Sequence, residues 1–251
     1  MLNKRNNPGG SNFLSSSVSS TQSIRLLVLY LSLIFFAVMM TACITNQINP
    51  SGRSENVSLK AEDLQKHGMS LITPTTASGK EEDKQAVALV FAGMLRENHP
   101  EIPLMTLTET LGRINSNGLE ERYQKMYRDY YDTGIFDRET LSEIGSITGT
   151  RYISQLKLAA FNQQSNSRLS FLGLRLVKTQ ESSIRMFMTI WDSADGTIAW
   201  EGMQELSYAY DTITEKPVSF RQAVEEASVE IIRRLPGDTG TTDALLDHSR
   251  Q

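Results

Sequence analysis

The chain has 251 residues, of which 39% are hydrophobic and 22% are charged, and its net charge is -4. This is an ordinary globular composition, long enough for one substantial domain but short for two. Three of the 25 basic residues, Lys4, Arg5 and Arg25, belong to the amino terminus. The rest of the chain has 22 basic and 29 acidic residues, which is a net charge of about -7. This acidic balance argues against nucleic acid as a partner.

The amino terminus has the pattern of a bacterial export signal. An apolar run of fifteen residues from Leu26 to Met40 contains one serine and follows Arg25. As a helix this run would cover roughly 22 Å, which is short of the about 30 Å hydrocarbon core of a bilayer. A basic flank, an apolar run of this length and small residues after it are typical of a secretory signal. We therefore expect residues 1–42 to be a signal peptide with a long disordered leader.

The residues that follow, Met40-Thr41-Ala42-Cys43, resemble the lipobox of bacterial lipoproteins. In that motif a small residue precedes the cysteine that receives diacylglycerol, and leucine usually stands where Met40 stands here. The resemblance implies cleavage between Ala42 and Cys43 and a lipid, including palmitate, on Cys43. This is the only cysteine of the chain, so no internal disulfide and no cysteine-based metal site can form. The alternative is an uncleaved signal anchor with an incidental cysteine.

The segment after the cysteine predicts where the protein is held. Cys43 is followed by Ile44 and not by an aspartate. By resemblance to the enteric sorting rule, this implies the outer membrane, with the protein facing the periplasm. Residues 43–66 lack apolar periodicity and contain Pro50 and Gly52, so we expect a lipidated tether there.

Residues 67–236 carry the patterns of one mixed domain, and residues 237–251 are expected to be a disordered tail. In chain order we expect a strand at 69–74, a helix at 81–98, a strand at 102–107, helices over 107–149, strands at 151–161, 169–177, 183–191 and 197–210, and a helix at 220–235. This order predicts a mixed α/β fold of α+β type. It has a strand-helix-strand start, an antiparallel run of strands, and a closing C-terminal helix packed on one sheet.

Two short motifs in this domain resemble a family of envelope proteins. Residues 145–153 (GSITGTRYI) and 192–200 (DSADGTIAW) are similar to segments of the CsgG, LpoB and TolB amino-terminal-domain group, although Thr150-Arg151 replaces the usual small-acidic pair. The members are the curli-pore lipoprotein, a peptidoglycan-synthase activator and a periplasmic domain. They are binding and assembly proteins, so the resemblance implies a related fold and no enzymatic activity.

The usual catalytic motifs are missing from the sequence. It contains no HExxH, GxSxG, P-loop or GxGxxG pattern, and His67, His99 and His248 have no ligand partner at helical spacing. We therefore predict no catalytic residues, no cofactor and no metal. The alternative is a hydrolase-like envelope enzyme acting on cell-wall material, whose carboxylate pair comes together only in the fold.

The segment 120–133 carries a stripe of tyrosines at helical spacing. Tyr123, Tyr127 and Tyr131 recur along one helix together with Arg128, and tyrosine and arginine are frequent in interface hot spots. These four residues are a candidate partner-binding face. Two other interpretations remain open: the stripe packs on the sheet with its hydroxyls at the rim, or it lines a carbohydrate or peptidoglycan groove.

The hypothesis that combines these features is a membrane-anchored periplasmic lipoprotein. We expect it to act as a non-catalytic binding, assembly or regulatory factor, with another envelope protein as its partner, and homo-oligomers are compatible with this. Besides the hydrolase, a purely structural lipoprotein remains as a further alternative.

Overall fold

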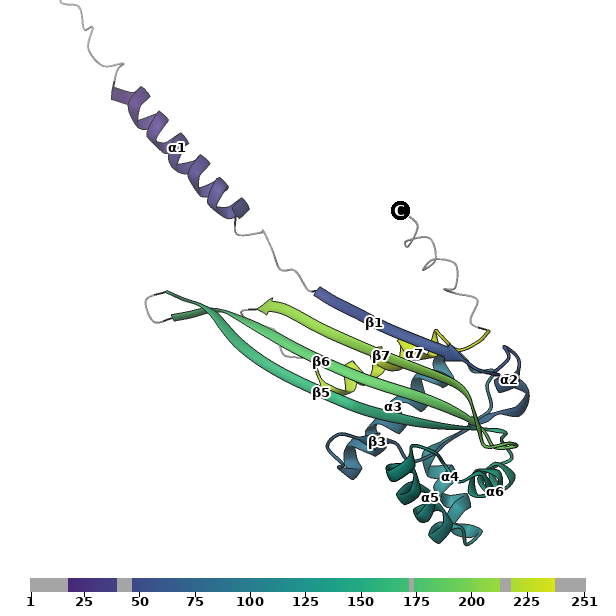
Figure 1. Ribbon diagram of the computed structural model, residues 1–251. Helices are drawn as coiled ribbons and strands as arrows, with labels where there is room; N and C mark the ends of the chain where they lie inside the picture. Colours follow the sequence, from purple (N-terminus) through teal and green to yellow (C-terminus); the bar gives the residue numbers. More distant parts are fainter. Residues whose placement is uncertain (1–17, 40–46, 172–173, 213–217, 238–251) are drawn as a thin grey trace, which may run out of the picture. The chain divides into compact units, whose positions relative to one another are not determined.

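The computed structural model describes residues 18–39, 47–171, 174–212 and 218–237 (Figure 1). The chain forms two compact units, residues 1–44 and 45–251. The first contains the helix α1 (Val18–Met39), which includes most of the apolar run. Neither this helix nor any other in the described ranges combines the length and apolarity that crossing a bilayer requires. Ala42 and Cys43, the leader 1–17 and the tail 238–251 lie outside the described residues.

The second unit is built on a mixed sheet of seven strands within the described residues. Its strands follow one another in the order β1 (Gln47–Asn56), β7 (Thr197–Thr212), β6 (Leu174–Asp192), β5 (Tyr152–Phe171), β2 (Met69–Leu71) and β4 (Leu104–Met105), and β3 (Thr75–Thr76) also pairs with β5. The four long strands are antiparallel, and β2, β3 and β4 pair in parallel. The predicted mixed fold is confirmed.

One face of the sheet, here called the inner face, is covered by α3 (Glu81–Asn98) and α7 (Phe220–Ile232) (Figure 1). The strand β6 supplies every second residue to this core, since Ile184, Met186, Met188 and Ile190 are all buried there. α3 has the predicted bounds, and three acidic residues in its first turn favour its positive end.

The opposite face, here called the outer face, is covered at one end only. There α4 (Leu107–Ser116), α5 (Glu120–Thr133) and α6 (Arg138–Thr148) enclose a second core with Ile153 and Trp191. Thr106 starts α4 with a capping box, and Asp137 caps α6. All residues of both cores lie between Leu59 and Leu235, which is within the second unit.

The short helix α2 (Asp63–His67) and the strand β1 correct the prediction of a featureless tether at 43–66. β1 pairs with β7 over ten residues, and Leu59 and Leu64 are buried in the main core. The prediction is wrong here because β1 is an edge strand. Its backbone makes the pairing while its described side chains are exposed, so it needs no apolar period.

The strands predicted at 151–161, 169–177 and 183–191 are two strands and not three. β5 and β6 form one long hairpin, and the polar stretches between the predicted strands continue the ladder. The range 169–177 is the end of this hairpin and includes the turn residues 172 and 173, which lie outside the described part. Polarity misled the prediction, since a hairpin partner satisfies the backbone whatever side chains stand there.

Candidate functional site

The predicted tyrosine face on α5 is divided by the structure. Tyr123 donates a hydrogen bond to Thr73 Oγ1 at 2.8 Å and accepts one from Thr73 N at 2.9 Å, while Tyr127 donates to the carbonyl oxygen of Thr73 at 2.5 Å. Burial raises the pKa of Tyr123 and raises that of Tyr127 well above its usual value. These hydroxyls fix the loop between β2 and β3, so both residues serve packing.

The other members of the stripe separate in the same way. Tyr130 stacks on Phe136 at 4.3 Å between ring centroids, which extends the second core. Tyr131 is 69% exposed and Arg128 is also exposed. The four predicted residues therefore do not share one exposed face, and only Arg128 and Tyr131 remain available to a partner.

The segments 145–153 and 192–200 meet at the carboxyl end of β6, where they contact each other. Arg151 binds the Asp192 carboxylate with two nitrogens, at 3.0 Å from Nε and 2.7 Å from Nη2. A Cβ on Gly145 would lie 2.3 Å from Ser193 Oγ, so only glycine fits where α6 meets the turn. Arg151 thus forms an ion pair that joins the residue before β5 to the end of β6. We therefore assign these two segments a structural role.

The open part of the outer face is the stronger candidate. Beyond α5, no helix of the second unit in the described ranges lies over this face of β1, β7, β6 and β5 (Figure 1). Directly opposed residues of neighbouring strands point to the same side of a sheet, about 5 Å apart. The register therefore arranges this face in rows that cross the strands.

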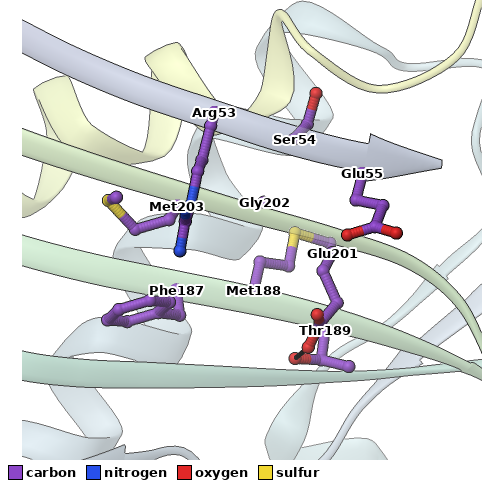
Figure 2. A pocket seen from close by; sticks show the side chains of 9 residues that line it. All are labelled: Arg53, Ser54, Glu55, Phe187, Met188, Thr189, Glu201, Gly202 and Met203. Atoms are coloured by element: carbon purple, nitrogen blue, oxygen red, sulfur yellow. Dashed lines mark hydrogen bonds between the residues drawn. The ribbon is translucent and has the colours of Figure 1, made fainter.

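The central row is apolar between two cations. It runs Arg53, Met203, Phe187 and Lys157, one residue from each strand. Met203 and Phe187 are half-buried and line a shallow hollow of about 330 Å³. Figure 2 shows the Arg53 side chain lying across β7 beside Met203. Across the described ranges no carboxylate pairs with Arg53, so its charge remains available.

The row on one side of it is acidic. Glu55 of β1 and Glu201 of β7 are direct partners in the register, and Thr189 follows on β6. The Thr189 hydroxyl donates to Glu201 Oε1 at 3.3 Å (Figure 2). Both carboxylates are exposed, and like charges directly opposite each other on a sheet repel. A cationic group bound between them would relieve this repulsion.

The row on the other side of the central row contains one ion pair and has no net charge from it. Arg185 and Glu205 are opposed in the register, and Arg185 Nη2 lies 2.8 Å from Glu205 Oε2. This pair satisfies its own charges, unlike Arg53, Glu55 and Glu201. Within the described residues the outer face is thus an apolar centre between two cations, Arg53 on β1 and Lys157 on β5, with two repelling anions beside it. The central row, Glu55, Glu201 and Thr189 are called the outer-face site below.

Sequence reasoning missed this site for identifiable reasons. Arg53 and Glu55 belong to the segment predicted as a tether, and a register between distant strands cannot be deduced from one sequence. One signal was present in β6: Phe187 is an aromatic residue on the polar side of an otherwise clean alternation. In the part of the chain that the structure describes, no three His, Cys, Asp or Glu side chains gather as a metal site would require.

Comparison with known proteins finds neither a matching family model nor a matching curated protein. Solved structures with a similar arrangement include a PelC dodecamer from Paraburkholderia phytofirmans, with 8% identity, a TM-score of 0.41, and coverage of 76% of this chain and 96% of that one. Lipoprotein GNA1162 from Neisseria meningitidis has 12% identity, a TM-score of 0.33, and coverage of 59% and 87%. The LpoB C-terminal domain from Salmonella enterica has 12% identity, a TM-score of 0.32, and coverage of 59% and 84%. Likeness at this level leaves the function to be argued from the chain itself.

Proposed function

We propose that this protein is a lipid-anchored, non-catalytic binding or assembly factor of the bacterial cell envelope, and that the outer-face site holds another envelope protein. The observation that carries the proposal is the pair Phe187 and Met203, half-buried at the centre of an open sheet face with uncompensated charges around it. Aromatic residues, Met and Arg are enriched where proteins bind each other, with a polar rim around an apolar centre.

The side chains of the site predict which chemical groups the partner presents to it. An apolar side chain of the partner would fill the hollow over Phe187 and Met203. A Lys or Arg beside it would lie between Glu55 and Glu201, where it offsets the repulsion of the two carboxylates. A carboxylate of the partner would pair with Arg53. A second copy of the chain could offer these groups as well, so a homo-oligomer is one form that the partner can take.

The resemblance of residues 40–43 to a lipobox supports an anchor at Cys43, and the described chain begins a strand soon after it. If Cys43 carries the lipid, only residues 44–46 separate it from β1, which begins at Gln47. Four steps of extended chain span at most about 14 Å. The outer-face site would therefore be held close to the membrane, and the residue after Cys43 favours the outer membrane with the domain in the periplasm. The resemblance of the two motifs to the CsgG, LpoB and TolB group agrees with a role in envelope assembly.

The alternative of an envelope hydrolase would rest on the carboxylate pair Glu55 and Glu201. A general acid at neutral pH needs a raised pKa, which burial in an apolar pocket normally supplies. Both of these side chains are exposed on a shallow face. Their setting supports a charged recognition surface more than a catalytic pair.

The test is in vivo crosslinking followed by recovery of the full-length protein from membranes. Two variants alter the site, Phe187→Ser with Met203→Ser, and Glu201→Lys. Two matched controls change exposed residues of α3, Leu89→Ser and Glu82→Lys. We expect one envelope protein to be recovered with wild type and controls and to fall by about tenfold or more with the site variants. Equal recovery with all variants, or no partner with wild type, would overturn the proposal.

A further inference from the structure

The strand β1 is the last strand on one side of the sheet, and one of its two edges is free. β1 pairs with β7 on one side only, and the described residues provide no strand on its other side. All side chains from residue 48 to residue 58 are exposed. A free edge presents a row of unpaired backbone groups, so it is a template for a further strand unless the chain blocks it.

The register shows which backbone groups face the free edge. Val57 N donates a hydrogen bond to the Ala199 carbonyl oxygen at 3.0 Å, which continues the pairing of β1 with β7 by one residue. In an antiparallel ladder, residues alternate between pairs that exchange hydrogen bonds and pairs that do not. The even-numbered residues of β1 therefore direct their N–H and C=O groups away from β7, toward the free edge.

Pro50 divides this edge into a blocked part and an open part. As an even-numbered residue it has its missing N–H on the free edge, where it removes no hydrogen bond of the ladder and hinders a further strand. Beyond it, Gly52, Ser54 and Asn56 offer both backbone groups to the free edge. The open part is therefore residues 52–56, which are called the β1 edge below.

The two charged side chains of the β1 edge make it complementary to itself. When two such edges pair antiparallel with Ser54 opposite Ser54, Arg53 of each copy stands opposite Glu55 of the other. A shift of one strand by two residues, in either direction, places Arg53 opposite Arg53 or Glu55 opposite Glu55. Opposite charges directly across two strands stabilise the pairing, and like charges destabilise it. The charges therefore favour a second copy of this chain as the occupant, in one register.

We propose that the β1 edges of two copies pair antiparallel about Ser54 and join the two sheets into one. In the single chain the Arg53 side chain lies across β7 (Figure 2). It is exposed, and no carboxylate among the described residues pairs with it. An exposed side chain changes its rotamer within nanoseconds, so Arg53 can turn toward Glu55 of the second copy. There its charge also offsets the repulsion between Glu55 and Glu201 of that copy.

This pairing deepens the proposed function and rests on it for the role of the outer face. It names the second copy as the source of the cation beside Glu55 and of the carboxylate beside Arg53, and it leaves Phe187 and Met203 to the envelope protein. Directly opposed residues point to the same side of a sheet, so the two outer-face sites lie on one continuous face. A partner with two binding elements can then occupy both sites at once.

Disulfide crosslinking of the full-length protein in intact cells treated with a mild oxidant tests this pairing. Ser54→Cys places a thiol opposite the same thiol of the second copy. The Cα atoms of such a pair lie about 5.5 Å apart, within the reach of a disulfide. Gln124→Cys, exposed on α5, is the matched control, and wild type controls for a bond through Cys43. Arg53→Glu, Glu55→Arg and the double exchange are each combined with Ser54→Cys.

We expect a disulfide-linked dimer from Ser54→Cys and from neither control. Arg53→Glu or Glu55→Arg alone places like charges opposite each other, so the yield of dimer should fall by about fivefold or more. The double exchange restores opposite charges and should restore the dimer.

Four results would overturn the proposal. They are no dimer from Ser54→Cys, an equal yield from either control, a yield that the single charge variants leave unchanged, and a double exchange that stays as low as the single variants. The envelope protein is scored separately, by photo-crosslinking from Phe187, so the pairing of two copies and the proposed function can fail independently.

Discussion

At the residue scale, the tyrosines of α5 show how one side-chain type serves two purposes. The Tyr127 hydroxyl is bound to the Thr73 carbonyl, whereas Tyr131 is 69% exposed. Tyr127→Phe leaves a partly buried carbonyl without this donor, so we expect a loss of about 1–2 kcal/mol in the free energy of unfolding. Tyr131→Phe is the control and should change it by less than about 0.5 kcal/mol. Urea unfolding of residues 45–251 measures both, and equal losses would contradict the division of the stripe.

The N-cap of α6 gives a pH dependence. Asp137 accepts hydrogen bonds from Thr140 N at 2.9 Å and from its hydroxyl at 2.6 Å, and these bonds lower the Asp137 pKa from its ordinary 3.8. A carboxyl whose pKa is lowered by folding stabilises the fold above its unfolded value, and this stabilisation is lost as the pH falls through the lowered value.

Asp137→Ala should therefore cost about 1 kcal/mol at neutral pH. The difference in the free energy of unfolding between this variant and wild type should disappear as the pH falls below 3.8. Unfolding curves recorded over a pH series would show this. A gap that stays constant on acidification would speak against an ionised cap.

At the element scale, β1 is the part of the fold that departs most from expectation. A Cβ on Gly52 would lie 2.2 Å from Gln204 Oε1, which accepts a hydrogen bond from Arg234 Nη1 at 2.6 Å. Gly52→Val must displace this partly buried pair, so we expect a loss of about 1–2 kcal/mol in the free energy of unfolding. Gly93→Ala, in α3 with open space around it, should be stabilising by about 0.5–1 kcal/mol. A Gly52→Val variant that unfolds at the same temperature as wild type would contradict the assignment of this segment to the sheet.

How far the sequence predicts the elements depends on how much each one buries. α3, α6 and the inner side of β6 were predictable, because caps and apolar spacing mark them. β1 and the far half of the hairpin were not. Their stability comes from backbone pairing with a neighbour strand, which leaves no period in the side chains.

At the scale of the whole molecule, the same reasoning explains why the candidate site escaped prediction. Its residues come from strands far apart in the sequence, and only the register brings Arg53, Met203 and Phe187 into one row. What the sequence does predict is the anchor at Cys43, which depends on a local motif alone. The anchor is thus a prediction from the sequence, whereas the outer-face site is visible only in the fold.

The anchor has its own prediction. Cys43→Ser should abolish palmitate labelling and leave the precursor unprocessed, because the lipid forms on the cysteine sulfur and cleavage follows it. Metabolic labelling and the mobility of the protein on a gel measure the two effects. A second variant, Ala42→Asp, keeps the cysteine and should slow cleavage of the precursor before Cys43. Labelling that persists in Cys43→Ser would remove the lipoprotein assignment.

The central claim is that the outer-face site binds an envelope protein. Its most direct measurement is site-specific photo-crosslinking in intact cells, with the probe at Phe187 or Thr189 of β6, and at the exposed Leu89 of α3 as the matched position. We expect one discrete adduct from positions 187 and 189, which Glu201→Lys abolishes, and none from position 89. Adducts of equal yield from position 89, or none from position 187, would contradict it.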